Sequence, residues 1–408
     1  MELIKVKKTH IAMINIPAFG HVNPTLAVVS ELVQRGYKVT YPATEKFVSV
    51  VEETGASVLP YHSSTTDLLD QLSHIKEINE VISNHSENLP MKFIEEAIST
   101  YYQLEQMYAD DLPGLILFDF MALGGKLFAA KHGIDAVRLY SSYANNENVS
   151  TLHDISDEIK IELASKIKAF SEKEGITGVS FMELFAPEKL NITFMPRAFQ
   201  LQGDLFDERF LFVGPSIGKR SYEESLPLGE NNDRPVMLIS LGTIFNPWPE
   251  FYKMCIEAFR NSGWQVVMST GNKISPESLG DIPDNFIVRQ QVPQLEVLPQ
   301  ARLFITHGGM NSTMEALSCG VPLVVIPQMF EQEITARRVT ELGLGQHFLP
   351  DEVTAQVLQK SVQEVSEDEQ LQQRVYDMQK NIQEAGGAKK AAEAIEKLLS
   401  LSNIQARV

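Results

Sequence analysis

Residues 307–312 combine glycines with polar side chains in a way that could bind an anion. They read His-Gly-Gly-Met-Asn-Ser and follow the apolar run of residues 303–306. Glycines let the backbone approach a ligand closely, and the first amides of a helix carry partial positive charge, so a phosphate would fit this turn. A bare Gly-Gly pair is more often an empty turn. Here His307, Asn311 and Ser312 add polar groups that a structural turn does not need.

A histidine and an aspartate in the other half of the chain could move a proton. His21 follows apolar residues 10–16, and Asp119 follows apolar residues 115–118. Neutral imidazole accepts a proton near neutral pH, and a carboxylate can fix its tautomer and stabilise the imidazolium. Two plainer interpretations stay open: His21 could be a hydrogen-bonded residue at a helix start, and Asp119 could cap a helix over residues 122–132.

These side chains are predicted to lie at the carboxyl ends of strands in parallel α/β sheets, where such folds bind ligands. Short buried strands are expected at residues 10–16, 38–43, 115–118, 136–140, 191–196, 236–240, 265–269, 287–289, 303–306 and 321–326. A second polar group, Gln328, Glu331 and Gln332, follows the last of them. The turn at residues 17–21 lacks the G-x-G-x-x-G pattern, which disfavours a dinucleotide cofactor.

The helix after the glycine turn has sequence signals at both ends. Ser312 and Glu315 form an S-x-x-E capping box, which predicts a helix start at Ser312, and Gly320 stands where a helix stop is expected.

Composition indicates two domains and excludes several classes of partner. A chain of 408 residues exceeds the size at which one core stops growing. The formal charge is 35 minus 53, or −18, which argues against binding nucleic acid or an anionic membrane. No apolar run approaches the ~18 residues of a transmembrane helix, and the two cysteines favour neither a disulfide framework nor a zinc site. We expect a cytoplasmic protein without stable membrane association.

Shifts in composition place the domain boundaries. The stretch that begins at Gly214 and Pro215 is rich in Gly, Pro, Ser and acids, so we expect an N-terminal domain at 1–214, a linker at 215–235 and a second domain at 236–385. The strand at 191–196 is expected to be the last of the first domain. Residues 62–111 have weak periodicity and are predicted to form solvent-facing helices. Residues 386–408 form a tail helix with an apolar stripe at Ala391, Ile395 and Leu398.

At residues 291–339 the chain resembles the UDP-sugar-dependent glycosyltransferases of small molecules, which include plant secondary-product and bacterial macrolide and flavonoid transferases. The residues that carry this resemblance are Pro293, Gln294, Glu296, Val297, Leu298, His307, Gly309, Asn311, Ser312, Glu315, Gly320, Val321, Pro322, Pro327, Glu331 and Gln332. Residues 17–36 also resemble the bacterial members, so the similarity covers both halves of the chain.

The resemblance implies a GT-B fold, an α/β architecture of two facing Rossmann-like domains with parallel sheets and an interdomain cleft. It also implies that the tail helix packs back toward the first domain. The implied activity is inverting transfer of a hexose from a UDP-sugar to a hydroxyl of a small hydrophobic acceptor such as a flavonoid, phenol or macrolide, with no metal or other cofactor. Glucose is the expected sugar.

The resemblance also implies roles for individual residues. His21 is the implied catalytic base, and Asp119 holds it. The implied donor-binding residues are Ser141, Ser142, Thr243, Val292, Gln294, His307, Gly309, Asn311, Ser312, Glu315, Glu331 and Gln332. Ordinary turn serines would explain Ser141 and Ser142 nearly as well, and Glu315 could close the capping box instead of accepting the ribose hydroxyls. Phe19, Phe120 and Met121 are placed beside the acceptor, although core packing would explain each of them.

Two positions depart from the family pattern. Gln291 stands where plant members have a tryptophan that stacks on the base, which leaves other nucleoside diphosphates open, and Glu331 stands where many relatives have aspartate. Two other functions compete with transfer: a nucleotide-sugar epimerase of the same fold and a non-catalytic nucleotide-sugar binding protein. An epimerase would need no acceptor, and a binding protein would turn nothing over.

Overall fold

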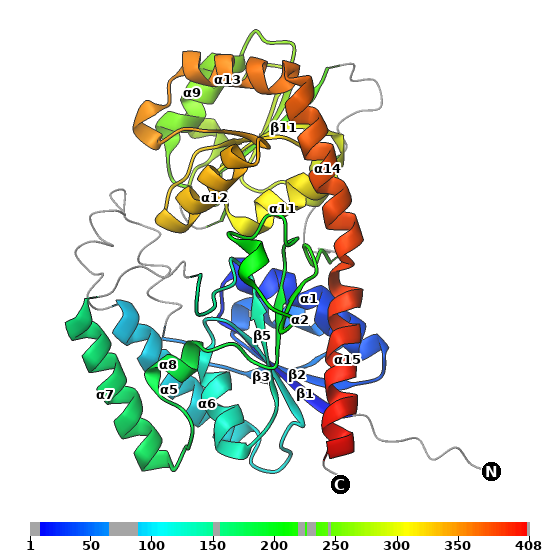
Figure 1. Ribbon diagram of the computed structural model, residues 1–408. Coiled ribbons are helices and arrows are strands. Elements are labelled where there is room, and N and C mark those ends of the chain that lie inside the picture. Colours follow the sequence, from blue (N-terminus) through cyan, green and yellow to red (C-terminus); the bar gives the residue numbers. More distant parts are fainter. Residues whose placement is uncertain are drawn as a thin grey trace. The chain divides into compact units, whose positions relative to one another are not determined.

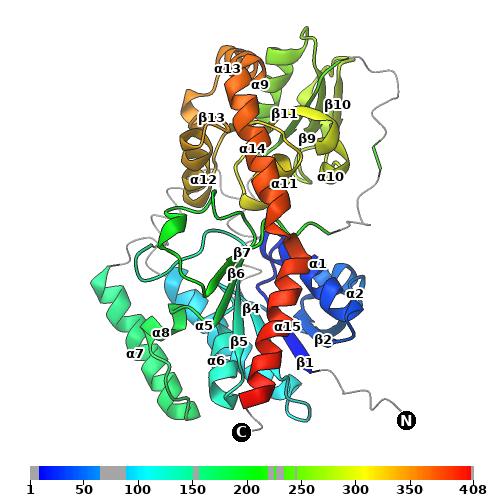
Figure 2. The ribbon, with the colours of Figure 1, turned by 45° about the vertical axis from the view of Figure 1, so that its right-hand side comes forward.

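The computed structural model describes residues 9–64, 89–149, 156–218, 225–226, 234–243 and 246–405. These residues form two compact units (Figures 1 and 2). The first unit contains the described residues up to 218 together with the C-terminal segment from Ala385. The second unit contains the described residues between 225 and 384. The first unit is therefore built from two separate stretches of the chain.

The first unit contains a seven-stranded parallel sheet in the order β3-β2-β1-β4-β5-β6-β7. Its strands are β1 (His10–Ile14), β2 (Lys38–Ala43), β3 (Ser57–Pro60), β4 (Leu115–Asp119), β5 (Ala136–Tyr140), β6 (Leu190–Thr193) and β7 (Phe210–Phe212). Its helices are α1 (Phe19–Gln34), α2 (Val48–Glu52), α5 (Leu89–Met107), α6 (Leu123–His132), α7 (Asp157–Glu174), α8 (Phe181–Phe185) and α15 (Gly387–Gln405). Short 3-10 helices occur at Glu45–Phe47 and Gly203–Leu205.

Alternate residues of the strands supply two separate cores, one on each face of the sheet. Ile11 and Met13 belong to the core formed with α1, α2 and α15, whereas Ala12 and Ile14 belong to the core formed with α5, α6, α7 and α8. Because both faces of a parallel sheet are covered by helices, its strands read as continuous apolar runs. This is why the sequence predicts β1, β2, β4, β5 and β6, although it predicts no strand at β3 or β7.

Two expectations for the first unit are wrong. Helix α5, predicted to face solvent, packs against α6 and buries Ile94, Tyr101 and Leu104 in the core. The other error concerns the strand at 191–196, which is not the last one, since β7 (Phe210–Phe212) pairs with β6 at the edge of the sheet. The part of the predicted helical region at 65–88 lies outside the described residues.

Helix α15 completes the first unit by packing against α1 (Figures 1 and 2). Ala391 and Ile395 are fully buried in the core that α1 shares, and the guanidinium of Arg35 lies 2.6 Å from the carboxylate of Glu396. Gly386, just before this helix, and Gly387, its first residue, have φ of 92° and 57°. Such values favour glycine, and they separate the end of α14 from the start of α15.

The second unit contains a six-stranded parallel sheet in the order β10-β9-β8-β11-β12-β13. Its strands are β8 (Val236–Ser240), β9 (Gln265–Ser269), β10 (Phe286–Arg289), β11 (Ala301–Thr306), β12 (Leu323–Val325) and β13 (Gly345–His347). Its helices are α9 (Pro249–Phe259), α10 (Gln294–Val297), α11 (Met310–Ser318), α12 (Phe330–Glu341), α13 (Ala355–Glu367) and α14 (Glu369–Ala385), with 3-10 helices at Pro276–Leu279, Leu298–Gln300 and Pro350–Glu352.

In both sheets the chain begins at a central strand, adds strands toward one edge, and then adds the remaining strands toward the other edge, as in Rossmann-like folds. The reversal lies between β1 and β4 in the first unit and between β8 and β11 in the second. Loops that leave two neighbouring strands at such a point diverge to opposite faces of the sheet, and ligands bind in the crevice between them. Ligand chemistry is therefore expected at these two points.

Candidate active site

In the first unit, three polar side chains meet at the reversal point. His21 lies in the first turn of α1, which follows β1, Asp119 is the last residue of β4, and Ser141 directly follows β5. The Nδ1 atom of His21 is 3.0 Å from Oδ2 of Asp119 and 2.9 Å from Oγ of Ser141. Oγ of Ser141 is also 3.0 Å from Oδ2 of Asp119. We call these residues the histidine cluster.

Burial makes the carboxylate of Asp119 dependent on its protein partners. Asp119 is 0% exposed and Ser141 is 5% exposed, whereas the His21 side chain keeps 20% of its surface accessible. A buried carboxylate is stable only when donors surround it. Asp119 accepts from the backbone N–H of Met121 through Oδ1, at 2.9 Å. Its Oδ2 contacts Ser141 and His21.

The structure excludes the plainer interpretation of Asp119 as a helix cap. Helix α6 begins at Leu123, its N-cap is Ala122, and no side chain caps it. Asp119 instead ends its strand with the carboxylate directed to His21 and Ser141. The sequence pairs Asp119 with the following helix only because a carboxylate shortly before a helix is a common capping signal.

Asn15 is a residue of this site that the sequence argument missed. It is 4% exposed, and its Nδ2 donates to the backbone carbonyl of His21 at 3.0 Å and to the hydroxyl of Tyr41 at 2.9 Å. Thr25 completes this network through a 3.0 Å contact with Tyr41, whose pKa is raised by burial. The available signal was a lone amide inside an apolar strand segment, because a buried amide needs partners.

Of the three predicted acceptor residues, Phe120 places its ring on the imidazole of the histidine cluster. Its ring stacks on His21 with centroids 5.7 Å apart and on Tyr140 with centroids 5.5 Å apart. Phe19 instead contacts Phe47 edge-on at 4.9 Å and packs on the core, and Met121 packs against the other core. The structure brings Phe120 to the predicted base and gives Phe19 and Met121 packing contacts.

In the second unit, the imidazole of His307 lies between two glycines at the reversal point. Ser240 and Thr306, which end β8 and β11, are paired in register. A Cβ built on Gly242, in the turn after β8, would lie 2.5 Å from Nε2 of His307, and one built on Gly309 would lie 2.4 Å from it. Real side chains do not approach so closely, so both positions require glycine while the imidazole stays in place.

His307 is a neutral group at physiological pH. Burial lowers the pKa of its imidazole to about 4, and a hydrogen bond to the backbone of Ser240 opposes this only in part. A neutral imidazole can hydrogen-bond to an anion but adds no positive charge. The electrostatic attraction of this turn must therefore come from backbone amides.

The predicted capping box at Ser312 is wrong. Helix α11 begins at Met310 with Gly309 as its N-cap, and no side chain caps it. Gly308 has a φ of 82° and Gly309 is extended, so the chain enters the helix earlier than the S-x-x-E pattern suggests. Ser312 and Glu315 are therefore both helical and share one face. The predicted stop is confirmed, since α11 ends at Ser318 and Gly320 has a φ of 72°.

Gln294 joins the two helical residues. Its Nε2 donates to Oε2 of Glu315 at 2.7 Å and to Oγ of Ser312 at 3.2 Å. Glu315 is 4% exposed, so this contact satisfies a nearly buried carboxylate. Sequence reasoning grouped these three residues only by resemblance, because they come from α10 and α11.

The polar residues after β12 lie beside the glycine turn, as expected. A Cβ on Gly308 would meet Val325 at 2.6 Å and the backbone oxygen of Gln332 at 3.4 Å. The Oε1 atom of Gln332 accepts from the backbone N–H of Gln328 at 2.7 Å, which directs its amide. Glu331 is exposed at the start of α12.

The remaining predicted donor residues are placed less specifically. Thr243 is exposed in the turn after β8, Val292 and Asn311 are half-buried, and Ser142 is half-buried next to Ser141. Gln291, which stands where plant members have tryptophan, is exposed, and its Nε2 donates to Oδ1 of Asn272 at 3.2 Å.

Among the described residues, no three His, Cys, Asp or Glu side chains are grouped as a metal site would require. The two cysteines, Cys255 and Cys319, are free thiols. Within the same part of the chain no helix is long and apolar enough to cross a membrane.

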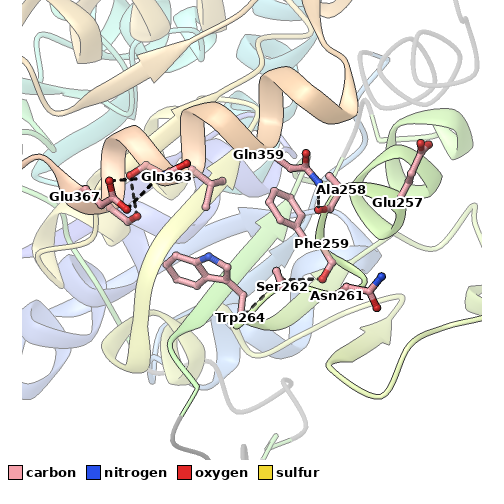
Figure 3. Close-up of a pocket in the computed structure, with 11 residues that line it drawn as sticks. Glu257, Ala258, Phe259, Asn261, Ser262, Trp264, Gln359, Gln363 and Glu367 are labelled. Carbon is pink, nitrogen blue, oxygen red and sulfur yellow. Dashed lines mark hydrogen bonds between the residues drawn. The ribbon is translucent and has the colours of Figure 1, made fainter.

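A pocket of about 370 Å³ lies elsewhere in the second unit, between the end of α9 and α13 (Figure 3). Trp264, Gln363 and Glu367 are among the residues that line it. The loop after α9 leads into the amino end of β9, so this pocket is at the opposite edge of the sheet from the glycine turn. It is not part of the site described above.

Comparisons with known proteins identify relatives of the whole chain. A family model described as the C-terminal domain of erythromycin biosynthesis protein CIII-like proteins matches residues 263–401. The NDP-glycosyltransferase YjiC of Bacillus licheniformis is 54% identical, over 97% of this chain and 99% of the relative. Demethyllactenocin mycarosyltransferase of Streptomyces fradiae is 34% identical, over 97% of this chain and 87% of the relative.

Among solved structures, the calicheamicin glycosyltransferase CalG4 is similar with a TM-score of 0.84 and 32% identity, covering 97% of this chain and all of that one. These similarities extend over both units. They give no support to an epimerase or to a binding protein without catalytic activity.

Proposed function

The chain belongs to the bacterial GT1-like glycosyltransferases of the GT-B fold and uses a nucleoside-diphosphate sugar, and we propose that it transfers glucose from UDP-glucose to a hydroxyl of a small apolar acceptor with inversion. Membership of the family and the class of donor follow from the relatives. The choice of UDP rests on the resemblance at residues 291–339, and the choice of glucose on the family pattern at Glu331 and Gln332. The mycarosyltransferase among the relatives carries the name of a different sugar, so the donor must be measured.

The observation that carries the proposal is the 3.0 Å contact between Nδ1 of His21 and the buried carboxylate of Asp119. A proton held on Nδ1 by the carboxylate leaves the lone pair of the imidazole on Nε2, where it can accept the proton of an acceptor hydroxyl. Asp119 then stabilises the imidazolium without being protonated itself. The deprotonated oxygen attacks the anomeric carbon, the bond from that carbon to the diphosphate breaks, and UDP leaves.

In the proposed mechanism, the second unit binds the leaving group. The diphosphate would lie at the start of α11, where the amides near Gly309, Asn311 and Ser312 point outward and the helix dipole favours negative charge. The imidazole of His307 would lie beside the diphosphate, with its single N–H held by the backbone of Ser240, and Thr243 would add its hydroxyl. These groups stabilise the charge that develops on UDP, so the proposal includes no metal ion, and turnover is expected to persist in excess EDTA.

The remaining donor contacts are proposed from the positions of polar groups. Glu315, oriented by Gln294, would accept the ribose hydroxyls, and the backbone at Val292 would contact the uracil. Glu331 and Gln332 would bind the sugar hydroxyls. Because Oε1 of Gln332 already accepts from Gln328, its Nε2 would face the sugar as a donor.

The acceptor is proposed to be a flat, apolar molecule with a hydroxyl, such as a phenol, flavonoid or macrolide. Phe120 supports this, because its ring stacks on the imidazole of His21 and is only half-buried. An aromatic acceptor could extend such a stack while bringing its hydroxyl to the base. A mass-spectrometric screen of UDP-sugars against these acceptors would identify the pair.

The direct test of the proposal is glycosylation of a phenol by His21→Ala and Asp119→Asn. Loss of a positioned general base is expected to lower turnover by about 10²- to 10⁴-fold. Isothermal titration with UDP should give the same affinity as for the unaltered protein, because the groups proposed above for the diphosphate, the ribose and the uracil all lie in the second unit. Near-normal turnover by His21→Ala would remove the base from the mechanism.

A further inference from the structure

We propose that Ser141 is a positioning residue that fixes the proton of His21 on Nδ1, rather than a ligand of the sugar donor. This inference rests on the proposed role of His21 as the base. It gives a function to a contact that the sequence could not reveal, since Ser141 and His21 are 120 positions apart.

The evidence is a closed triangle of hydrogen-bond distances. The distance is 3.0 Å from Nδ1 of His21 to Oδ2 of Asp119, 2.9 Å from Nδ1 to Oγ of Ser141, and 3.0 Å from Oγ to Oδ2. A serine hydroxyl has one proton and two lone pairs. It can therefore donate to only one of its two neighbours and must accept from the other.

Only one arrangement of protons suits an ionised Asp119. If Ser141 donated to Nδ1, that nitrogen would carry a lone pair, which would face the carboxylate oxygen at 3.0 Å and repel it. If Ser141 donates to Oδ2, then Nδ1 carries the proton and shares it between Oδ2 and Oγ. The triangle thus selects the tautomer that presents the Nε2 lone pair, which the proposed base requires.

Burial makes this contact difficult to replace. Asp119 is 0% exposed and Ser141 is 5% exposed. With the hydroxyl removed, Oδ2 would lose a donor in a place that little water reaches, and His21 could turn about its side-chain bonds. The only proton of the Ser141 hydroxyl is also committed to Asp119, so it is not available to a sugar oxygen.

The inference is tested with Ser141→Ala, Ser141→Thr and, as a control, Ser165→Ala on the exposed side of α7. Ser141→Ala should lower kcat for a phenol about 10- to 100-fold, while the KM for UDP-glucose changes less than about twofold. Ser141→Thr keeps the hydroxyl and should recover most of kcat, and Ser165→Ala should match the unaltered protein. A raised donor KM with normal kcat would instead make Ser141 a donor ligand and overturn the inference.

A second measurement needs neither substrate nor turnover. Two-dimensional NMR of ¹⁵N-histidine-labelled protein reports which ring nitrogen carries the proton, and His21→Ala assigns the signal. The unaltered protein should show His21 protonated on Nδ1, and Ser141→Ala should shift this signal toward a mixture of tautomers. Identical His21 signals in the two proteins would overturn the inference.

The two measurements separate this inference from the proposed function. If His21→Ala kept full turnover, the base would be wrong, yet the NMR comparison would still decide whether Ser141 holds the imidazole. Should Ser141→Ala fold poorly, Ser141→Cys has a similar size and a weaker hydrogen bond, and the same changes in kcat and in the His21 signal are expected in smaller measure.

Discussion

The imidazole of His307 occupies space that exists because two residues lack side chains. Gly242 and Gly309 come from the turn after β8 and the start of α11, and each would place a Cβ within 2.5 Å of the ring. The site thus combines a neutral hydrogen-bonding group with backbone amides that a larger residue would cover. On a chain with a formal charge of −18, the proposed diphosphate site would attract an anion without a basic surface.

Gly309→Ala tests this arrangement at the level of one methyl group. The φ of Gly309 is −59°, so alanine causes no backbone strain there, and its effect comes from the clash with His307. We expect the KM for the donor and the Kd for UDP to rise about 10-fold or more, because the ring must move into the anion site. Steady-state kinetics and calorimetry measure both constants.

Gly263→Ala is the matched control for that experiment. It lies in an exposed loop of the same unit, and a Cβ there would meet nothing within 4 Å. Its donor constants should equal those of the unaltered protein. If Gly309→Ala bound UDP as tightly as this control, the proposed diphosphate site would be wrong.

At the scale of elements, both units use the same device. A sheet with one reversal point places the loops after two central strands next to each other, which brings His21 to Asp119 in one unit and Gly242 to His307 in the other. Neither pair is close in sequence. The strand order, more than any local motif, assembles the chemistry.

Helix α15 provides a prediction about stability. Ile395 is fully buried between this helix and the core of the first unit, so Ile395→Ala should lower the free energy of unfolding by about 3 kcal/mol. Lys397, on the exposed side of the same helix, should change it by less than about 0.5 kcal/mol when replaced by alanine. Urea denaturation followed by circular dichroism measures both variants. Equal effects would mean that the docking of α15 contributes little to the first unit.

The buried strands and the glycine turn could be predicted because their signals are local. Apolar runs mark strands that are covered on both faces, and Gly320 marks the end of α11. The burial of helix α5 is hidden in the sequence because its buried residues are spread among polar ones. No strand is predicted at β3, β7 or β13 because each is only three or four residues long. The start of α11 was misplaced because the conformation of Gly308 and Gly309, which the S-x-x-E rule ignores, decides it.

The contacts of Ser141 and Asn15 were beyond sequence reasoning for a different reason. Each depends on which strands are neighbours and on how far each strand extends past the sheet edge. Serine after a strand is common in ordinary turns, so residue type alone carried no information. Only the parallel pairing of β4 with β1 and β5 brings Ser141 to the histidine cluster.

At the scale of the molecule, the two units can be followed separately in solution. The chain has two tryptophans, Trp248 and Trp264, and both lie in the second unit. Tryptophan fluorescence therefore reports unfolding of the second unit alone. Circular dichroism reports both units together.

This probe allows a test of the pKa of His307. Its folded value of about 4 is below the unfolded value of about 6.5, so the unfolded chain binds a proton before the folded one does as the pH falls. Stability contributed by the neutral imidazole is complete above pH 6.5 and is lost between 6.5 and 4. The second unit should lose up to about 3 kcal/mol over this range from His307 alone.

His307→Gln separates this effect from other titrations, because it removes the ionisable ring and leaves the remaining groups unchanged. Urea denaturation followed by fluorescence at pH 7 and pH 4.5 should show a smaller loss of stability for the variant, by about 2 kcal/mol. If both proteins lost the same free energy of unfolding between pH 7 and pH 4.5, the pKa of His307 in the folded protein would not be lowered.

Because α15 belongs to the first unit but is the last helix of the chain, it affects how the protein folds during synthesis. The ribosome synthesises the whole second unit before it synthesises α15, the helix that packs on α1. Until then the apolar face that α15 covers in the first unit stays exposed. Cutting the gene between the units would therefore not release two complete halves, since the earlier half needs the last residues to be translated.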